Sequence, residues 1–216
     1  DIILPARIIS NGPEAAGRLC QIMENIEPNR EKSDAELVSL ALANRDDFLY
    51  IVDRYRPQLL SYIRRLTNIR PPDAEDLLQE IFIKVYLNLN DFDRKLKFSS
   101  WIYRIAHNQV ISSYRKLKAR PEGNEIDWEE PAVKRILAES DVAGQADQSL
   151  LQEAVAGALG RLPDKYREVL VLRFLEEKSY QEISDIIKKP GGTVASWLNK
   201  AKEAFRDEFP KNFQER

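Results

Sequence analysis

The sequence has almost none of the residues that form disulfides or bind zinc. Its 216 residues include one cysteine, Cys20, and one histidine, His107. A single cysteine cannot close a disulfide within the chain, and the two residues together cannot supply the ligands of a Cys/His metal cluster. We therefore expect a protein of the reducing cytoplasm, with no metal and no cofactor.

Long hydrophobic segments are also missing. No apolar run approaches the roughly 18 to 20 residues that span a bilayer. The N-terminus lacks the basic and then apolar order of a signal peptide. We expect no membrane insertion.

The net charge is only -2, so affinity for nucleic acid has to come from local segregation of charge. Residues 94–120 contain eight basic residues and no acidic one, whereas residues 121–147 contain eight acidic and two basic residues. In a helical projection of the basic stretch, one side is apolar: Ile102, Ile105, Ala106, Val110 and Leu117. Another side is polar: Arg104, Asn108, Ser112 and Arg115. This pattern predicts a helix with one core face and one polyanion face, and a solvated basic helix is the alternative.

The helical pattern begins after an extension of unknown function, residues 1–32. Ser33 and Glu36 form a capping-box pattern that opens a helix through about residue 43. A helix over residues 46–66 follows, and Pro57 should kink or split it. Together with the segments up to residue 120, these helices predict one compact helical bundle, module 1 (residues 33–120).

A third helix is expected to start at Asp73, after a loop closed by Pro71 and Pro72. Its buried side is Leu77, Ile81, Val85 and Leu89. Its opposite side is an exposed acidic strip of Asp76, Gln79 and Glu80 with Ile83 beside it. The strip is a solvated face, a binding surface, or the carboxylate cluster of a metal-dependent enzyme. The last alternative lacks a histidine, a phosphate-binding loop and a second acidic cluster.

The remaining chain predicts a loop, a linker and a second helical unit. Residues 88–98 are a loop before the basic helix, which Ser99 or Ser100 can cap. Residues 121–146 form a flexible acidic linker. In module 2 (residues 147–216), helices end near residues 162 and 175. A second capping box at Ser179 and Glu182 then opens a short helix, a glycine-containing turn follows, and Thr193 caps or begins the last helix. This order is typical of a helix-turn-helix.

Three motifs in this order resemble a known family. They are DAEDLLQEIFIKVY, FSSWIYRIAHNQVISSYRK and, after the linker, LPDKYREVLVLRFLEEKSYQEISDIIKKPGGTV. The chain resembles a bacterial RNA polymerase sigma factor of the extracytoplasmic-function (ECF) type across roughly residues 34–209. The resemblance implies an all-α protein of two small helical domains, a transcription initiation factor that is not an enzyme, and two partners, core RNA polymerase and promoter DNA. A possible further partner is an anti-sigma factor.

The resemblance also assigns roles to residues in module 1. In the family, the helix that matches residues 73–86 docks on the largest polymerase subunit, which assigns core-polymerase binding to Asp73, Asp76, Gln79 and Glu80. The next helix reads and melts the -10 element, which places Arg104, Asn108, Ser112 and Arg115 against DNA. The loop before it holds a flipped base, and its candidates are Asn88, Asn90, Asp91 and Phe92.

In module 2 the resemblance implies recognition of the -35 element by the last helix. The expected DNA-binding residues are Thr193, Ser196, Trp197, Asn199, Lys200 and Lys202. The family usually carries arginines at the positions of Trp197, Lys200 and Lys202. Because lysine is a point charge and tryptophan donates one N–H, we expect an unusual or weak -35 contact, with Trp197 able to pack on the helix instead. The remaining alternative is a helix-turn-helix regulator that works without polymerase.

Overall fold

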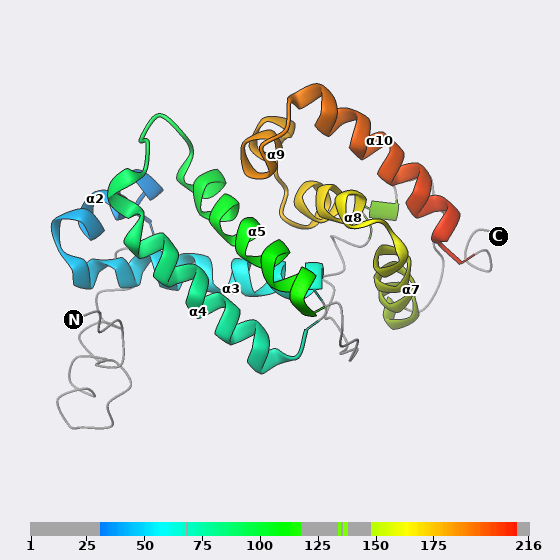
Figure 1. Ribbon diagram of the computed structural model, residues 1–216, viewed down its shortest axis with the longest axis horizontal. Helices are drawn as coiled ribbons and strands as arrows, with labels where there is room; N and C mark the ends of the chain where they lie inside the picture. Colours follow the sequence, from blue (N-terminus) through cyan, green and yellow to red (C-terminus); the bar gives the residue numbers. More distant parts are fainter. Residues whose placement is uncertain (1–30, 68, 118–133, 135, 138–147, 211–216) are drawn as a thin grey trace.

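The computed structural model describes residues 31–67, 69–117, 134, 136, 137 and 148–210. These residues are helical with no strand among them, and they form two helical modules that pack against each other (Figure 1). Nearly all of the extension and most of the acidic linker lie outside the described residues. From the linker, Ile136 and Leu137 are described, and both are buried.

Module 1 contains four α-helices and two short 3-10 turns. They are α2 (Asp34–Ala43), η1 (Arg45–Asp47), α3 (Phe48–Thr67), α4 (Pro71–Leu87), η2 (Leu89–Asp91) and α5 (Phe98–Leu117). The predicted capping box starts α2, where Ser33 N–H donates to the Glu36 carboxylate at 2.7 Å and Ser33 Oγ accepts from Glu36 N–H at 3.3 Å. The carboxylate of Asp34 then ties α2 to α3 by accepting from Arg54 and Tyr55.

Two predictions that involved prolines differ from the observed helices. The helix α3 is not split at Pro57 but runs on to Thr67. Pro57 lies on the exposed side of α3, while neighbours such as Leu59 are buried and hold the inner face of the helix in the core. The helix α4 starts at Pro71 rather than Asp73, because a proline in the first turn loses no intrahelical hydrogen bond.

The start of α5 also differs from the prediction. Neither Ser99 nor Ser100 caps the helix, which begins at Phe98. Burial fixes this start, because the Phe98 ring packs edge-on against Tyr55 with centroids 5.6 Å apart. The predicted buried side is confirmed, since Leu77, Ile81 and Val85 of α4 and Leu89 of η2 are all buried.

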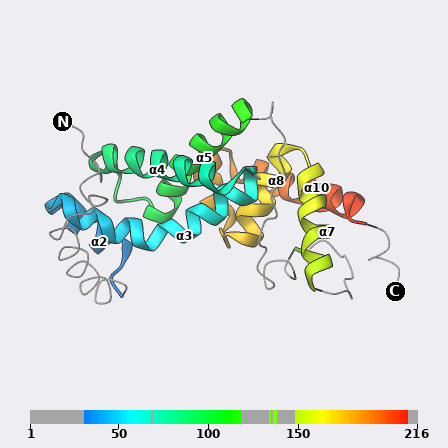
Figure 2. The ribbon, with the colours of Figure 1, turned by 90° about the horizontal axis from the view of Figure 1, so that it is seen from below.

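Module 2 contains α7 (Gln148–Arg161), α8 (Asp164–Leu170), the π-helical segment η3 (Val171–Leu175), α9 (Tyr180–Ile187) and α10 (Gly191–Glu208). The second capping box is confirmed at Ser179 and Glu182. The last helix begins at Gly191, two residues before Thr193, because the Pro190 carbonyl accepts from the N–H groups of Thr193 and Val194. The helix α10 lies along α8, and α9 lies against α5 of module 1 (Figures 1 and 2).

Candidate nucleic-acid and polymerase interfaces

A cavity of about 430 Å³ lies between α4, η2 and α5. Its lining residues are Lys84, Asn88, Asp91, Trp101, Ile105, Asn108, Gln109 and Ser112. Four of the residues predicted to bind -10 DNA are therefore brought to one site. Two of them come from the end of α4 and η2, and two from the polar face of α5.

The lining combines an apolar wall with hydrogen-bonding groups. Trp101 and Ile105 provide the apolar surface, and the amides of Asn88 and Asn108 lie beside it. The Asn88 Nδ2 group donates to the Lys84 carbonyl at 2.7 Å, which fixes the orientation of that amide. A nucleobase has an aromatic face and a polar edge, so this combination is chemically suited to hold one.

Among the described side chains, three predicted -10 residues do not line the cavity. Asn90 is exposed, and Arg104 is half-buried on α5. The Phe92 ring packs on Phe98 and Trp101, with centroids 5.3 and 5.2 Å away. Phe92 thus supports the Trp101 wall from the core. The Arg115 side chain lies outside the described residues.

The sequence interpretation did not assign Lys84, Gln109 or Trp101 to this site. Lys84 donates to the side-chain oxygen of Gln109, and Gln109 donates to the Glu80 carboxylate. This chain of hydrogen bonds links the acidic strip on α4 to the rim of the cavity. The i, i+4 spacing of Glu80 and Lys84 was a signal that the two share a helix face.

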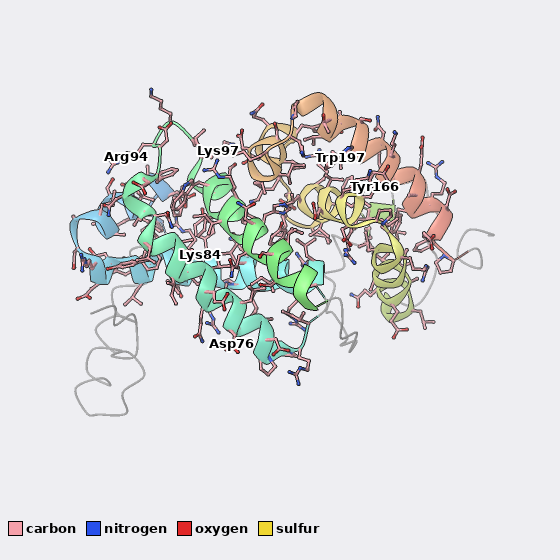
Figure 3. The ribbon with its side chains drawn as sticks, in the orientation of Figure 1. Asp76, Lys84, Arg94, Lys97, Tyr166 and Trp197 are labelled. Atoms are coloured by element: carbon pink, nitrogen blue, oxygen red, sulfur yellow. The ribbon has the colours of Figure 1, made fainter. Side chains whose placement is uncertain are left out.

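The acidic strip on α4 faces solvent as predicted. Asp76, Gln79 and Glu80 are exposed. Next to them, Ile83 and Leu87 are 38% and 53% exposed, so the strip continues as an apolar patch. Figure 3 shows Asp76 and Lys84 along α4. Asp73 differs from the other three predicted residues because it is half-buried and pairs with Arg70 at 2.9 Å.

The helix-turn-helix consists of α9, a turn and α10. Lys188 ends α9 with left-handed backbone angles, φ 55° and ψ 47°, and Ser184 Oγ donates to the Lys189 carbonyl at 2.6 Å. On α10, the predicted residues Ser196, Asn199 and Lys200 are exposed, whereas Thr193 and Lys202 are half-buried. The exposed three form the accessible part of the predicted -35 face.

Trp197 lies on the side of α10 that meets α8. The residue is half-buried and packs against the core, and the Lys165 ammonium lies 5.8 Å from its ring centroid and 4.9 Å from that of Tyr166. Figure 3 shows Trp197 and Tyr166 close together at the α8–α10 contact. Part of the Trp197 ring surface is therefore covered by its packing at the α8–α10 contact.

Two further classes of site are absent from the described part of the chain. No helix there is both long and apolar enough to cross a bilayer. In the same residues, no group of three or more His, Cys, Asp or Glu side chains is arranged to hold a metal ion.

Comparison with known proteins identifies the family. Models of Sigma-70 region 2 and Sigma-70 region 4 match residues 51–120 and 152–205. The ECF RNA polymerase sigma factor SigW of Bacillus subtilis (strain 168) is 36% identical over 176 residues, which cover 77% of this chain and 90% of that protein. The chain belongs to the ECF RNA polymerase sigma factors. The predicted family, all-α two-domain fold and role in promoter-directed transcription initiation are confirmed, with core RNA polymerase and promoter DNA as partners.

Other relatives agree with this assignment. The ECF RNA polymerase sigma-E factor of Escherichia coli (strain K12) is 31% identical to this sigma factor over 164 residues, covering 73% of this chain and 83% of that protein. Two solved structures have a similar fold. CnrH in complex with the cytosolic domain of CnrY is 22% identical with a TM-score of 0.60, covering 82% of this chain and 96% of that chain. RpoE in complex with the anti-sigma factor NepR, from Bartonella quintana, is 23% identical with a TM-score of 0.54, covering 75% and 96%.

Proposed function

We propose that this sigma factor opens the -10 element by capturing one base of the non-template strand in the cavity between α4 and α5. The convergence of Asn88, Asp91, Asn108 and Ser112 beside the Trp101 wall carries this proposal. Extruding a base costs a few kcal/mol. Stacking on an aromatic side chain contributes about 1–3 kcal/mol per base, and hydrogen bonds add to it. Binding can therefore offset the cost of opening without a catalysed reaction.

The other predicted -10 residues have supporting roles in this proposal. Arg104 and Arg115 neutralise phosphates along α5, which makes DNA binding dependent on salt. Asn90 and Phe92 belong to the segment that carries the extruded base to the cavity. Because all of these steps are binding steps, we propose that the protein is not an enzyme.

We propose that α4 docks on core RNA polymerase through Asp76, Gln79 and Glu80. The exposed apolar side chains of Ile83 and Leu87 support this role, because protein interfaces combine apolar contacts with a polar rim. Asp73, paired with Arg70, belongs to the end of the same surface.

For the -35 element, we propose that α10 enters the major groove from its N-terminal end. The main contacts come from the exposed residues Ser196, Asn199 and Lys200. The half-buried residues Thr193 and Lys202 lie at the edges of this surface. Trp197 contributes to the contact indirectly, because its packing holds α10 in position against α8. The resulting contact lacks a bidentate arginine, so we expect -35 recognition to be weak and to depend on tethering by polymerase.

Regulation by a partner protein is a further part of the proposal. The two solved structures that share the fold are complexes, one with CnrY and one with an anti-sigma factor. By analogy, an anti-sigma factor would bind this sigma factor in the cytoplasm, where it meets core polymerase. We keep residues 1–32 as an extension and residues 121–146 as a linker in this proposal, and we assign neither of them a role.

In-vitro transcription with purified core polymerase on genomic fragments tests the proposal. We expect defined start sites, and permanganate reactivity of -10 thymines that is lost with Asn108→Ala. Gln58→Ala, at an exposed position of α3, is the matched control and should leave the reactivity unchanged. Equal reactivity in both variants would refute the assignment of the cavity. Tight promoter binding without polymerase would favour the independent regulator instead.

A further inference from the structure

A buried carboxylate joins the two modules. Glu176 of module 2 pairs with Arg65 of α3 at 3.0 Å, and the two side chains are 5% and 4% exposed. The Tyr103 hydroxyl of α5 donates to the other Glu176 oxygen at 2.6 Å. The Lys178 ammonium lies 4.1 Å from the centroid of the Tyr103 ring. We refer to Arg65, Tyr103, Glu176 and Lys178 as the Glu176 cluster.

The backbone around Glu176 is irregular on both sides. Before it, the chain leaves α8 through the π-helical segment η3, and after it Glu177 has a positive φ of 52°. A positive φ is uncommon outside glycine, and such conformations persist where surrounding contacts enforce them. Single π-helical turns often occur at functional sites. The Glu176 cluster provides contacts that enforce this conformation.

Two weaker contacts extend the same interface. Glu182 at the start of α9 pairs with Lys97 at 3.2 Å, and Glu168 of α8 lies 4.0 Å from His107 Nε2. Figure 3 shows Lys97 on the side of module 1 that faces α9. Carboxylates of module 2 therefore lie against cationic or polar groups of module 1, and Lys97 belongs to the basic stretch.

The helices in this contact have other expected partners. The helix α5 faces the -10 DNA, and α9 is the first helix of a helix-turn-helix, which crosses the DNA backbone when the second helix enters the groove. In the structure, α5 and α9 pack on each other. The contact leaves the residues assigned to DNA exposed, Asn108 and Ser112 on α5 among them. The -10 and -35 elements, however, lie about 25 base pairs apart, roughly 85 Å of duplex. Two modules packed directly against each other cannot reach both elements, so the closed arrangement and the promoter-bound arrangement exclude each other.

We propose that the Glu176 cluster is an intramolecular latch that keeps the free sigma factor closed until core polymerase binds the open form. The competition between closing and DNA binding rests on the function proposed above. Removing one partner of a buried ion pair leaves an unpaired charge in the closed form, and water solvates that charge in the open form. Replacing both partners with apolar residues of similar volume removes this penalty.

The distance between the modules in the free full-length protein tests the latch directly. Fluorescent labels are placed at Asp53→Cys in α3 and Glu203→Cys in α10, both exposed, in a Cys20→Ser background. We expect Glu176→Ala to shift the closed-to-open ratio at least a hundredfold toward open. The double variant Arg65→Met/Glu176→Met should return the energy transfer to the closed value.

The affinity for core polymerase is the second measurement. If polymerase binds the open form, Glu176→Ala should bind at least tenfold more tightly than the wild type, because no free energy is spent on opening. Glu208→Gln is the control, since it weakens the exposed Arg161–Glu208 pair within module 2, and it should change neither measurement.

Each outcome separates the latch from the proposed function. Energy transfer in Glu176→Ala equal to wild type, with unchanged circular dichroism, would overturn the latch. An open Glu176→Ala variant with wild-type affinity for polymerase would overturn its regulatory role. Absence of polymerase binding in every variant would refute the proposed function. The distances between the modules in the free protein would still show whether the Glu176 cluster holds the closed form.

Discussion

The Tyr62 hydroxyl lies 3.1 Å from Nδ1 of His107, and both side chains are buried between α3 and α5. Burial lowers the pKa of His107 from its ordinary 6.5 to about 4, and the Glu168 carboxylate at 4.0 Å from Nε2 does not offset it. The neutral imidazole is therefore the form that fits the folded protein.

This pKa predicts an acid-sensitive stability. As the pH falls from about 6.5 to about 4, the unfolded chain binds a proton at His107 that the folded chain does not bind. The free energy of unfolding should decrease over that window, by about 3 kcal/mol in total from this residue. Urea titrations of the wild type and His107→Gln at pH 7 and pH 4.5 measure the difference. Equal losses in the two proteins would show that His107 contributes nothing.

The double variant Gln79→Ala/Glu80→Lys should bind core polymerase more weakly, because it removes one contact and reverses one charge on α4. We expect a loss of about 2 kcal/mol, roughly thirtyfold in Kd. Titration of labelled sigma factor with core polymerase gives the affinity. Asp53→Lys, an exposed charge reversal on α3, is the control and should bind like the wild type.

Lys200 and Trp197 should give different phenotypes although both lie on α10. Lys200→Ala removes an exposed positive charge, so it should weaken DNA binding and reduce the slope of log K against log salt by about 0.9. Trp197→Ala removes packing against α8, so it should lower the free energy of unfolding by about 2 kcal/mol and leave that slope unchanged. The reverse pattern would place Trp197 on the DNA.

The capping box of α2 predicts a stability effect without a functional one. Ser33→Ala should cost about 1 kcal/mol, because the side-chain acceptor for the Glu36 N–H is lost. Ser39→Ala on the same helix is the matched control, since its hydroxyl donates to the Ala35 carbonyl within the helix and contributes little. Thermal unfolding of both variants distinguishes the two roles.

Local chemistry explains which features were predictable from the sequence. Ser33 and Ser179 begin helices because each interacts with a glutamate three residues away, and that spacing is visible in the chain. The Glu80–Gln109–Lys84 bridge and the position of Trp197 depend on how helices pack, which spacing does not specify. Arg65 and Glu176, 111 residues apart, are charged residues that a sequence assigns to the surface, so their burial could not be expected.

The chemistry of the Glu176 cluster also affects the protein after the modules separate. A contact centred on hydrophobic side chains would leave two apolar patches that favour aggregation. The Glu176 cluster adds to the contact a carboxylate, a guanidinium, a hydroxyl and an ammonium, which are all readily hydrated once the modules separate. Hydration of these four groups should therefore reduce the tendency of the opened sigma factor to aggregate while it searches for polymerase.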